Sequence, residues 1–445
     1  MISVKEYMRQ QIFRLAWPVI LEMLGIMLVS ILVTAMVGRL GAVSLAAVGL
    51  ATMVQFSTAM IFAAAGTGAA AIVSREVGAG NWKGVKVITG QAILLAALCG
   101  TALAVAGYFA AGQIFAVIGA DPAVAALAAA LLKIMYLFTP FYLVMAVGNA
   151  ILRGMGQTRG AFLITTASNI LALTVSYLLI FGRGLPELGA YGAAWGTALS
   201  QLAGGFLVIA ALFANDRTRL RPGLVISWQP AVVSRILAVS LPAAGEQVAM
   251  QGGRIVFTFM LAGVGAVQFA AHQIAVQAES ISFMPGFGFS VAAMTLTGVQ
   301  LGRGLAHRAE QYVWLTNRIA LISMAAMSLV FLLFARPLTG LFIDDPAVVH
   351  WGTLLVMIAA LEQPTIAVTY VLGGALRGAG DTRWPMYVTT AGVWLVRIPL
   401  AYLFLIVWRC DITVAWYITA GDFLLRSIVL WRRFTGRKWQ KIKID

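Results

Sequence analysis

Two octapeptides, LRGMGQTR at residues 152–159 and LRGAGDTR at residues 376–383, agree at six of eight positions, and their residue numbers differ by 224. The same offset relates residue pairs that chance rarely duplicates, even in a chain rich in Ala and Gly. These pairs are Pro18 and Pro242, Glu22 and Glu246, Gly80 and Gly304, Asp121-Pro122 and Asp345-Pro346, and Pro140 and Pro364. The register holds from residue 18 to residue 383, so the chain is a duplication of one unit.

The composition places both copies in a membrane. Of 445 residues, 61% are hydrophobic and only 11% are charged, which is too little charge to cover a soluble protein of this size. The apolar runs are about 20 residues long without alternation of polar and apolar residues, so they predict helices and not the strands of a barrel. We predict an all-α polytopic membrane protein with about twelve transmembrane helices.

The repeat also predicts how these helices are arranged. Six spans in each copy is an even number, so both copies begin on the same side and form two parallel six-helix repeats around a central cavity. We predict an N-terminal lobe of residues 1–216 and a C-terminal lobe of residues 217–445, which ends in a basic cytoplasmic tail. Rocking of such lobes gives alternating access, and this predicts a transporter.

The charge distribution predicts orientation and partners. The net charge is +15, and the Lys and Arg residues sort to one side of the predicted spans. By the positive-inside rule, both termini are cytoplasmic and the protein lies in the cell membrane. The positive charge is thus explained without nucleic acid as a partner. The expected partners are a small organic substrate and membrane lipid, and the protein is expected to be a monomer. Two cysteines, Cys99 and Cys410, predict neither a disulfide framework nor a metal site.

Three segments resemble a known family. VTAMVGRLGAVSLAAVG at residues 33–49, AAHQIAVQAESISFMPGFGFSVAAMTLTG at residues 270–298, and LRGAGDTR together resemble the multidrug and toxic compound extrusion (MATE) transporters of bacteria. The resemblance covers about residues 12–430. It implies two six-helix lobes, a V-shaped cavity, and efflux of organic, often cationic compounds in exchange for sodium ions or protons.

The chain departs from this family where many members bind the coupling ion. Many members carry Asp before TAMVGRLG, where this chain has Val33. Members with a first-lobe cation site tend to have Asn and Asp at the positions of Ala172 and Ser176, and some place an acid at the position of Met250. The first-lobe ion site is therefore expected to be missing, and coupling is expected in the second lobe.

Ionisable residues inside the spans are costly in a membrane, so each is a candidate. The candidates for cation coupling or substrate binding are Glu246, Glu279, Glu362, Glu22, Arg254, Gln55 and Gln251. For Glu22 and Glu246 the alternative is favourable contact with a helix N-terminus, and for Glu279 it is an interhelical hydrogen bond. Arg254 is expected to neutralise Glu279 on the neighbouring helix.

Other features have more modest interpretations. Lys133 and Arg397 have no clear partner. His272 is expected to pack with a hydrogen bond, and the alternative is a proton relay. Asp422 and Arg426 predict a helix-surface pair because they are four residues apart. Pro364 should break its helix. In each octapeptide, Gly is expected to end a helix, Arg to complement the helix dipole, and Thr to cap the next helix.

Two other functions are considered. A flippase for a lipid-linked precursor needs cations for pyrophosphate, and only Lys133, Arg254 and Arg397 are available. An integral-membrane enzyme is less favoured, because the chain has no HExxH, GxSxG or P-loop motif. We therefore expect no enzyme activity and no cofactor. Without a P-loop, the energy source is an ion gradient or the gradient of the substrate itself; for an ion gradient, the expected coupling ion is H⁺ or Na⁺.

Overall fold

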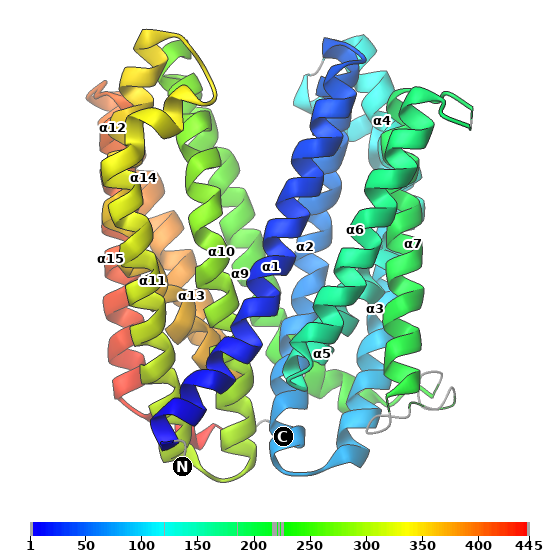
Figure 1. The fold of residues 1–445 in the computed structure, drawn as a ribbon, viewed down its shortest axis with the longest axis vertical. Helices are drawn as coiled ribbons and strands as arrows, with labels where there is room; N and C mark the ends of the chain where they lie inside the picture. The colour runs from blue at the N-terminus through cyan, green and yellow to red at the C-terminus, as the bar shows by residue number, and fades with distance from the viewer. Residues whose placement is uncertain are drawn as a thin grey trace. The chain divides into compact units, whose positions relative to one another are not determined.

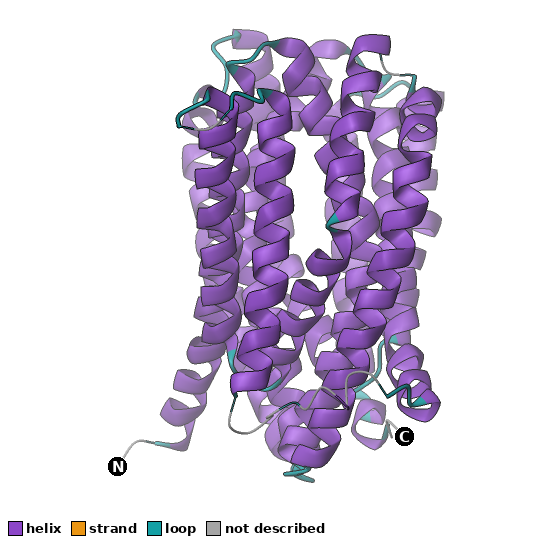
Figure 2. Cartoon of the chain, turned by 90° about the vertical axis from the view of Figure 1, so that its right-hand side faces the viewer, coloured by secondary structure: helices purple, strands orange, loops and turns teal. Residues whose placement is uncertain are grey.

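The chain is all-helical in the computed structural model, which describes residues 3–119, 121–184, 186–215, 220, 223 and 227–442. No strand occurs in these ranges (Figure 2). Ten of the described helices are long and apolar enough to cross a membrane, or eleven if the bent pair α4 and α5 is one span. The predicted fold class, an all-α polytopic membrane protein, is confirmed.

Most helices of the second half begin at positions that the offset of 224 relates to helix starts of the first half to within two residues. The first half contains α1 (Val4–Gly38), α2 (Ala42–Gly78), α3 (Trp82–Ile118), α4 (Pro122–Leu137), α5 (Thr139–Gly154), α6 (Thr158–Phe181) and α7 (Ala190–Ala214). The second half contains α9 (Pro230–Ala262), α10 (Ala266–Gly302), α11 (Ala306–Gly340), α12 (Pro346–Gly378), α13 (Arg383–Ala391), η1 (Gly392–Arg397), α14 (Ile398–Ala401), η2 (Tyr402–Val407), α15 (Ile412–Thr435) and η3 (Lys438–Lys441). The first residues of α10, α11 and α12 are related to those of α2, α3 and α4 by the same sequence offset as the octapeptides.

The repeated Asp-Pro sequences explain one pair of helix starts. The side chain of Asp121 accepts a hydrogen bond from the Ala123 N–H at 2.9 Å, and Asp345 accepts one from the Ala347 N–H at 2.8 Å. In both helices the next residue is a proline, whose missing N–H costs nothing in the first turn. The duplicated motif is therefore an N-cap followed by a proline at the first helical position.

The glycines of the octapeptides turn the chain, as predicted, but the threonines do not cap. Gly156 and Gly380 have φ of +80° and +82°, a left-handed conformation that favours glycine. The N-caps of α6 and α13 are Gln157 and Thr382, and neither makes a side-chain cap hydrogen bond. The predicted capping role of the threonine is wrong.

The described helices form two compact units. The N-terminal unit is Leu21–Ala244, and the C-terminal unit is Met1–Ile20 together with Gly245–Asp445. The two breaks fall at positions that the repeat makes equivalent, so α1 and α9 each contribute residues to both units. The predicted boundary between residues 216 and 217 separates the two sequence repeats. It lies outside the described residues and stays a prediction.

Each unit has the same pattern of neighbouring helices. In the N-terminal unit, α2 packs against α3, α4 and α5, and α6 packs against α7. In the C-terminal unit, α10 packs against α11 and α12, and α15 packs against α12 and α13 (Figure 1). Duplicated sequence thus gives duplicated packing.

Two helices differ between the halves. α4 and α5 meet at a 54° bend beside Pro140, whereas α12 continues as one helix through Pro364. The prediction that Pro364 breaks its helix is wrong. The predicted span 384–408 contains two π-helical segments, η1 and η2, which the hydropathy pattern does not reveal.

Candidate cation-coupling site

The duplicated glutamates have duplicated partners. Arg153 Nη2 lies 2.5 Å from Glu22 Oε1, and Arg377 Nη2 lies 2.6 Å from Glu246 Oε1. Arg153 and Arg377 are the equivalent arginines of the two octapeptides. The arginine therefore binds a specific carboxylate in its own unit. It also lies in the last turn of its helix, where its charge complements the helix dipole as predicted.

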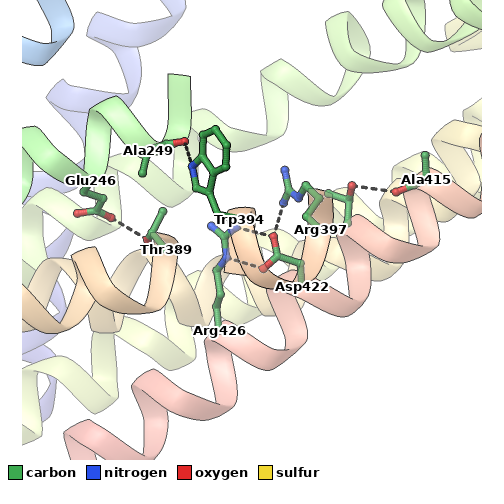
Figure 3. Close-up of polar contacts among 9 residues, drawn as sticks. Glu246, Ala249, Thr389, Trp394, Arg397, Ala415, Asp422 and Arg426 are labelled. Carbon is green, nitrogen blue, oxygen red and sulfur yellow. Dashed lines mark hydrogen bonds and ion pairs between the residues drawn. The ribbon is translucent and has the colours of Figure 1, made fainter. Parts of the chain in front are cut away.

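A threonine completes each pair. Thr165 donates to Glu22 at 2.7 Å. Thr389 donates to Glu246 at 2.9 Å, as Figure 3 shows. Glu22 is 2% exposed and Glu246 is 4% exposed. A buried carboxylate with a guanidinium partner needs no further cation for charge balance. These two candidates are thus held in structural ion pairs, and contact with a helix N-terminus is not needed to explain them.

Glu279 and Glu362 lie in a different environment. They come from α10 and α12 of the C-terminal unit, and their residues are 7% and 1% exposed. In each carboxylate, Oε1 has no hydrogen-bond partner among the described residues. The charges of the two carboxylates interact with each other, and the charge of Arg397 interacts with both. Two buried carboxylates with unpartnered oxygens provide a chemical setting suited to binding a cation.

Beside them lies an ion cluster around Asp422 of α15. Arg426 binds this carboxylate through two contacts, Nε to Oδ1 at 2.7 Å and Nη2 to Oδ2 at 2.5 Å. Arg397, at the end of η1, places Nη2 2.8 Å from Asp422 Oδ2 (Figure 3). The predicted pair of Asp422 and Arg426, four residues apart, is confirmed, but Asp422 is fully buried and Arg426 is 5% exposed, so its predicted place on the helix surface is wrong. Arg397, for which no partner was expected, has one.

The remaining candidates are not part of this cluster. Arg254 is exposed and makes no ion pair among the described residues, so the predicted neutralisation of Glu279 by Arg254 is wrong. Gln251 is half-buried. In the N-terminal unit, Gln55 donates to the Met135 carbonyl at 3.1 Å and to Gln201 Oε1 at 3.4 Å. Gln55 therefore makes neutral interhelical contacts.

His272 and Lys133 each contact aromatic side chains. His272 packs against the rings of Phe269 and Trp416, with centroid separations of 6.1 and 5.6 Å, as predicted. Its Nδ1 has no hydrogen-bond partner among the described residues, so the structure does not show the hydrogen bond that was expected at this nitrogen. The ammonium of Lys133 lies 5.4 Å from the Tyr108 ring centroid, a cation–π contact that the sequence did not reveal.

The ion cluster has no charged counterpart in the N-terminal unit. Subtracting 224 from 279, 362 and 397 gives Gln55, Phe138 and Leu173. When α15 is aligned with α7 by their first residues, Asp422 and Arg426 correspond to Ser200 and Gly204. All five charges thus occur in one unit only. This joint asymmetry is a sequence signal that could have grouped Arg397, Asp422 and Arg426 with the two glutamates.

The positions at which the family resemblance implies a first-lobe ion site hold other residues in this chain. Val33 packs against a buried apolar cluster that includes Leu131 and Ala194. Ala172 and Ser176 are buried, and a Cβ added to Gly196 would collide with the Ser176 hydroxyl. Apolar packing fills the neighbourhood of these positions.

Comparison with known proteins agrees with the duplication. The family model MatE matches residues 18–178 and 242–403, two segments whose first residues are 224 apart. The chain belongs to the MatE family. It is therefore a multi-pass membrane transporter and not an enzyme.

Relatives cover the MatE chain almost from end to end. The probable multidrug resistance protein NorM of Thermotoga maritima is 31% identical over 97% of this chain and 93% of its own length. The multidrug resistance protein PmpM of Pseudomonas aeruginosa is 25% identical over 88% of this chain and 83% of its own. An FAD transporter of Shewanella oneidensis is 26% identical over 86% of this chain and 85% of its own.

Solved structures share the fold. An outward-facing multidrug resistance MATE transporter superimposes with a TM-score of 0.90 at 22% identity, covering 98% of this chain and 97% of the other. A transporter of the same superfamily from Pyrococcus furiosus gives 0.89 at 22% identity, with 98% and 97% covered.

Proposed function

We propose that this protein exports organic compounds, cationic or amphipathic, across the cell membrane in exchange for H⁺ or Na⁺. The proposal includes alternating access and cytoplasmic termini. It is supported by family membership and by relatives named as multidrug resistance proteins. The duplication favours it too, because parallel repeats are a common architecture of secondary transporters.

The observation that carries the coupling part is the pair Glu279 and Glu362. Both are buried in a unit that lies in an apolar membrane protein, and each has a carboxylate oxygen without a partner among the described residues. An unpaired buried carboxylate is costly, and binding a proton or a metal cation removes that cost. Cation binding at this pair is therefore strongly favoured, and it supplies the coupling.

The charge balance supports a single coupling cation. Glu279, Glu362 and Asp422 carry three negative charges when ionised, and Arg397 and Arg426 carry two positive charges. This leaves one negative charge for a monovalent ion to neutralise. Neither Glu22 nor Glu246 enters this balance, because each has its own arginine.

The flippase alternative receives less support from the same contacts. It needs cations that are free to hold pyrophosphate. Lys133 lies over Tyr108, Arg397 is bound to Asp422, and Arg254 is an exposed side chain outside the cluster. Lys133 and Arg397 thus already have partners, which weakens the flippase alternative.

The test is transport of radiolabelled tetraphenylphosphonium by purified protein in proteoliposomes, with proton and sodium gradients imposed separately. We expect one gradient to drive transport, and Glu279→Gln or Glu362→Gln to reduce it at least about tenfold, because a neutral amide cannot exchange the cation. Glu187→Gln is the matched control, since Glu187 is exposed in the segment between α6 and α7.

Two outcomes would contradict this proposal. Wild-type protein that is inserted and monodisperse but transports under neither gradient would refute cation-driven export of this substrate. Full gradient-driven transport by the Glu279→Gln, Glu362→Gln double variant would remove these carboxylates from the coupling step.

A further inference from the structure

Arg397 occupies an unusual position in the C-terminal unit. It ends the π-helical segment η1, and only the short helix α14 separates it from the second π-helical segment, η2. π-Helical turns are rare and occur frequently at functional sites. The guanidinium binds Asp422 at 2.8 Å and interacts electrostatically with the two glutamates.

We propose that Arg397 is a built-in counter-ion of the coupling site. It remains on Asp422 while Glu279 and Glu362 hold the coupling cation, and it neutralises the glutamates after the cation leaves. This inference rests on the proposed function, because it assigns the residue that exchanges with the coupling ion.

Asp422 does not depend on Arg397 as its partner. Arg426, one turn away on the same helix, already contacts both carboxylate oxygens of Asp422. Segment η1 packs closely against this ion pair because Gly392 has no side chain. A Cβ at Gly392 would collide with Asp422 and Arg426. Departure of Arg397 therefore leaves a complete ion pair behind, and no buried charge is stranded on α15.

Arg397 itself is held by few directional contacts. Neither its Nε nor its Nη2 has a hydrogen-bond partner among the described residues, so the 2.8 Å contact of Nη2 with Asp422 is an ion pair without hydrogen-bond geometry. The guanidinium lies over two aromatic rings, 5.8 Å from the centroid of Phe257 and 5.5 Å from that of Phe423. Contacts with ring faces constrain direction less than a bidentate pair does. The side chain can thus move toward the glutamates without breaking a hydrogen-bond network.

The acceptors for such a movement are available. Oε1 of Glu279 and Oε1 of Glu362 lack partners within the described part of the chain. The charged and titratable groups that interact with them are Arg397 of η1, Tyr370 of α12, and Asp422 of α15 with its partner Arg426. Of the two cations in this set, Arg426 is committed to Asp422, which leaves Arg397.

The duplication argues that Arg397 serves the glutamates and not the fold. In the N-terminal unit, the position of Arg397 holds Leu173, and the positions of Glu279 and Glu362 hold Gln55 and Phe138. The same helical packing therefore forms without any of these charges. The arginine and the acids occur together, as expected for a counter-ion and the groups that it neutralises.

The test measures binding of tetraphenylphosphonium to purified protein as a function of pH at fixed sodium, and again as a function of sodium at fixed pH. In wild type, the coupling ion competes with the substrate. In Arg397→Gln, the glutamates lose the competing positive charge and hold the coupling ion more tightly. For a proton, the midpoint of the binding profile moves to higher pH by about one unit or more; for sodium, inhibition appears at about tenfold lower concentration.

Several variants make this result decisive. Arg397→Lys keeps the charge and should stay close to wild type. Arg397→Met keeps packing on Phe257 and Phe423 and should reproduce the shift if Arg397→Gln does not fold. Arg336→Gln removes an exposed arginine of the same unit and should leave the profile unchanged.

The failure of the inference and that of the proposed function look different. If Glu279→Gln and Glu362→Gln abolish ion competition but folded Arg397→Gln and Arg397→Met retain the wild-type profile, the counter-ion role is wrong and the coupling site stands. If the glutamate variants retain ion competition, the proposed coupling site itself is wrong.

Discussion

Glu246 and Arg377 form a partly buried ion pair whose counterpart, Glu22 with Arg153, recurs in the other repeat. The two pairs have the same separation along the chain, and the threonine donors occupy equivalent positions as well. Two copies of one contact within a single chain indicate that it was present in the unit that duplicated. The simplest role for such a contact is to fix α1 and α9 to the helices that follow.

We predict that Glu246→Gln destabilises the protein by about 1–3 kcal/mol, because Arg377 loses its anionic partner in a mostly buried position. Thermal unfolding monitored by cysteine-reactive dye would measure this. Glu310→Gln is the control, since its partner Arg437 is 64% exposed and such a pair contributes about 0–1 kcal/mol. Wild-type stability combined with lost transport in Glu246→Gln would return Glu246 to the coupling candidates.

At the scale of the helix, the turns between spans recur with the repeat. Gly80, between α2 and α3, has φ of +73°, and Gly304, between α10 and α11, has φ of +76°. A Cβ at either position would meet no atom within 4 Å, so backbone conformation alone requires glycine. The sequence pair Gly80 and Gly304 is thereby explained.

Gly304→Ala should therefore destabilise the protein by about 1 kcal/mol, the cost of a left-handed conformation for alanine. Gly421→Ala is the matched control: it also has open space around the added Cβ, but it lies within α15, where alanine favours the helix by about 0.5–1 kcal/mol. The two variants should shift the unfolding temperature in opposite directions. Shifts of the same sign would mean that the turn geometry does not determine the requirement for glycine.

At the scale of the whole molecule, we predict the orientation in the membrane from the distribution of charge. Lys and Arg outnumber Asp and Glu by 31 to 16, and the sequence places most of this excess on the side of both termini. Exposed Ser3 and Lys441 lie near the two ends, and exposed Arg183 lies after α6 on the side predicted to face outward.

We predict that Ser3→Cys and Lys441→Cys, in a chain with Cys99 and Cys410 replaced, react with a membrane-impermeant maleimide only in inverted vesicles. Arg183→Cys should react in intact cells, because an odd number of spans separates it from the N-terminus. Labelling of all three from one side would overturn the orientation and the parallel relation of the repeats.

The sequence predicts which residues belong to the candidate site better than it predicts which of them contact one another. Glu279 and Glu362 were recognisable because ionisable residues are rare inside apolar runs. The sequence predicts Arg254 as the partner of Glu279, but Arg254 is exposed. It predicts no partner for Arg397, which forms an ion pair with Asp422 in the structure. Sequence spacing does not say which face of a helix meets which neighbour, so such pairings are not readable from one chain.

Features that depend on neighbouring residues and on the surrounding lipid can be predicted from the sequence alone. Long apolar runs require helices in lipid, the Asp-Pro pairs start them, glycines turn between them, and one constant offset makes the second half repeat the first. The pairing of the octapeptide arginines with Glu22 and Glu246, the π-helical segment that ends at Arg397, and the grouping of five charges in one unit depend on the folded structure. These contacts join residues far apart in the chain, and the packing of side chains from several helices selects them.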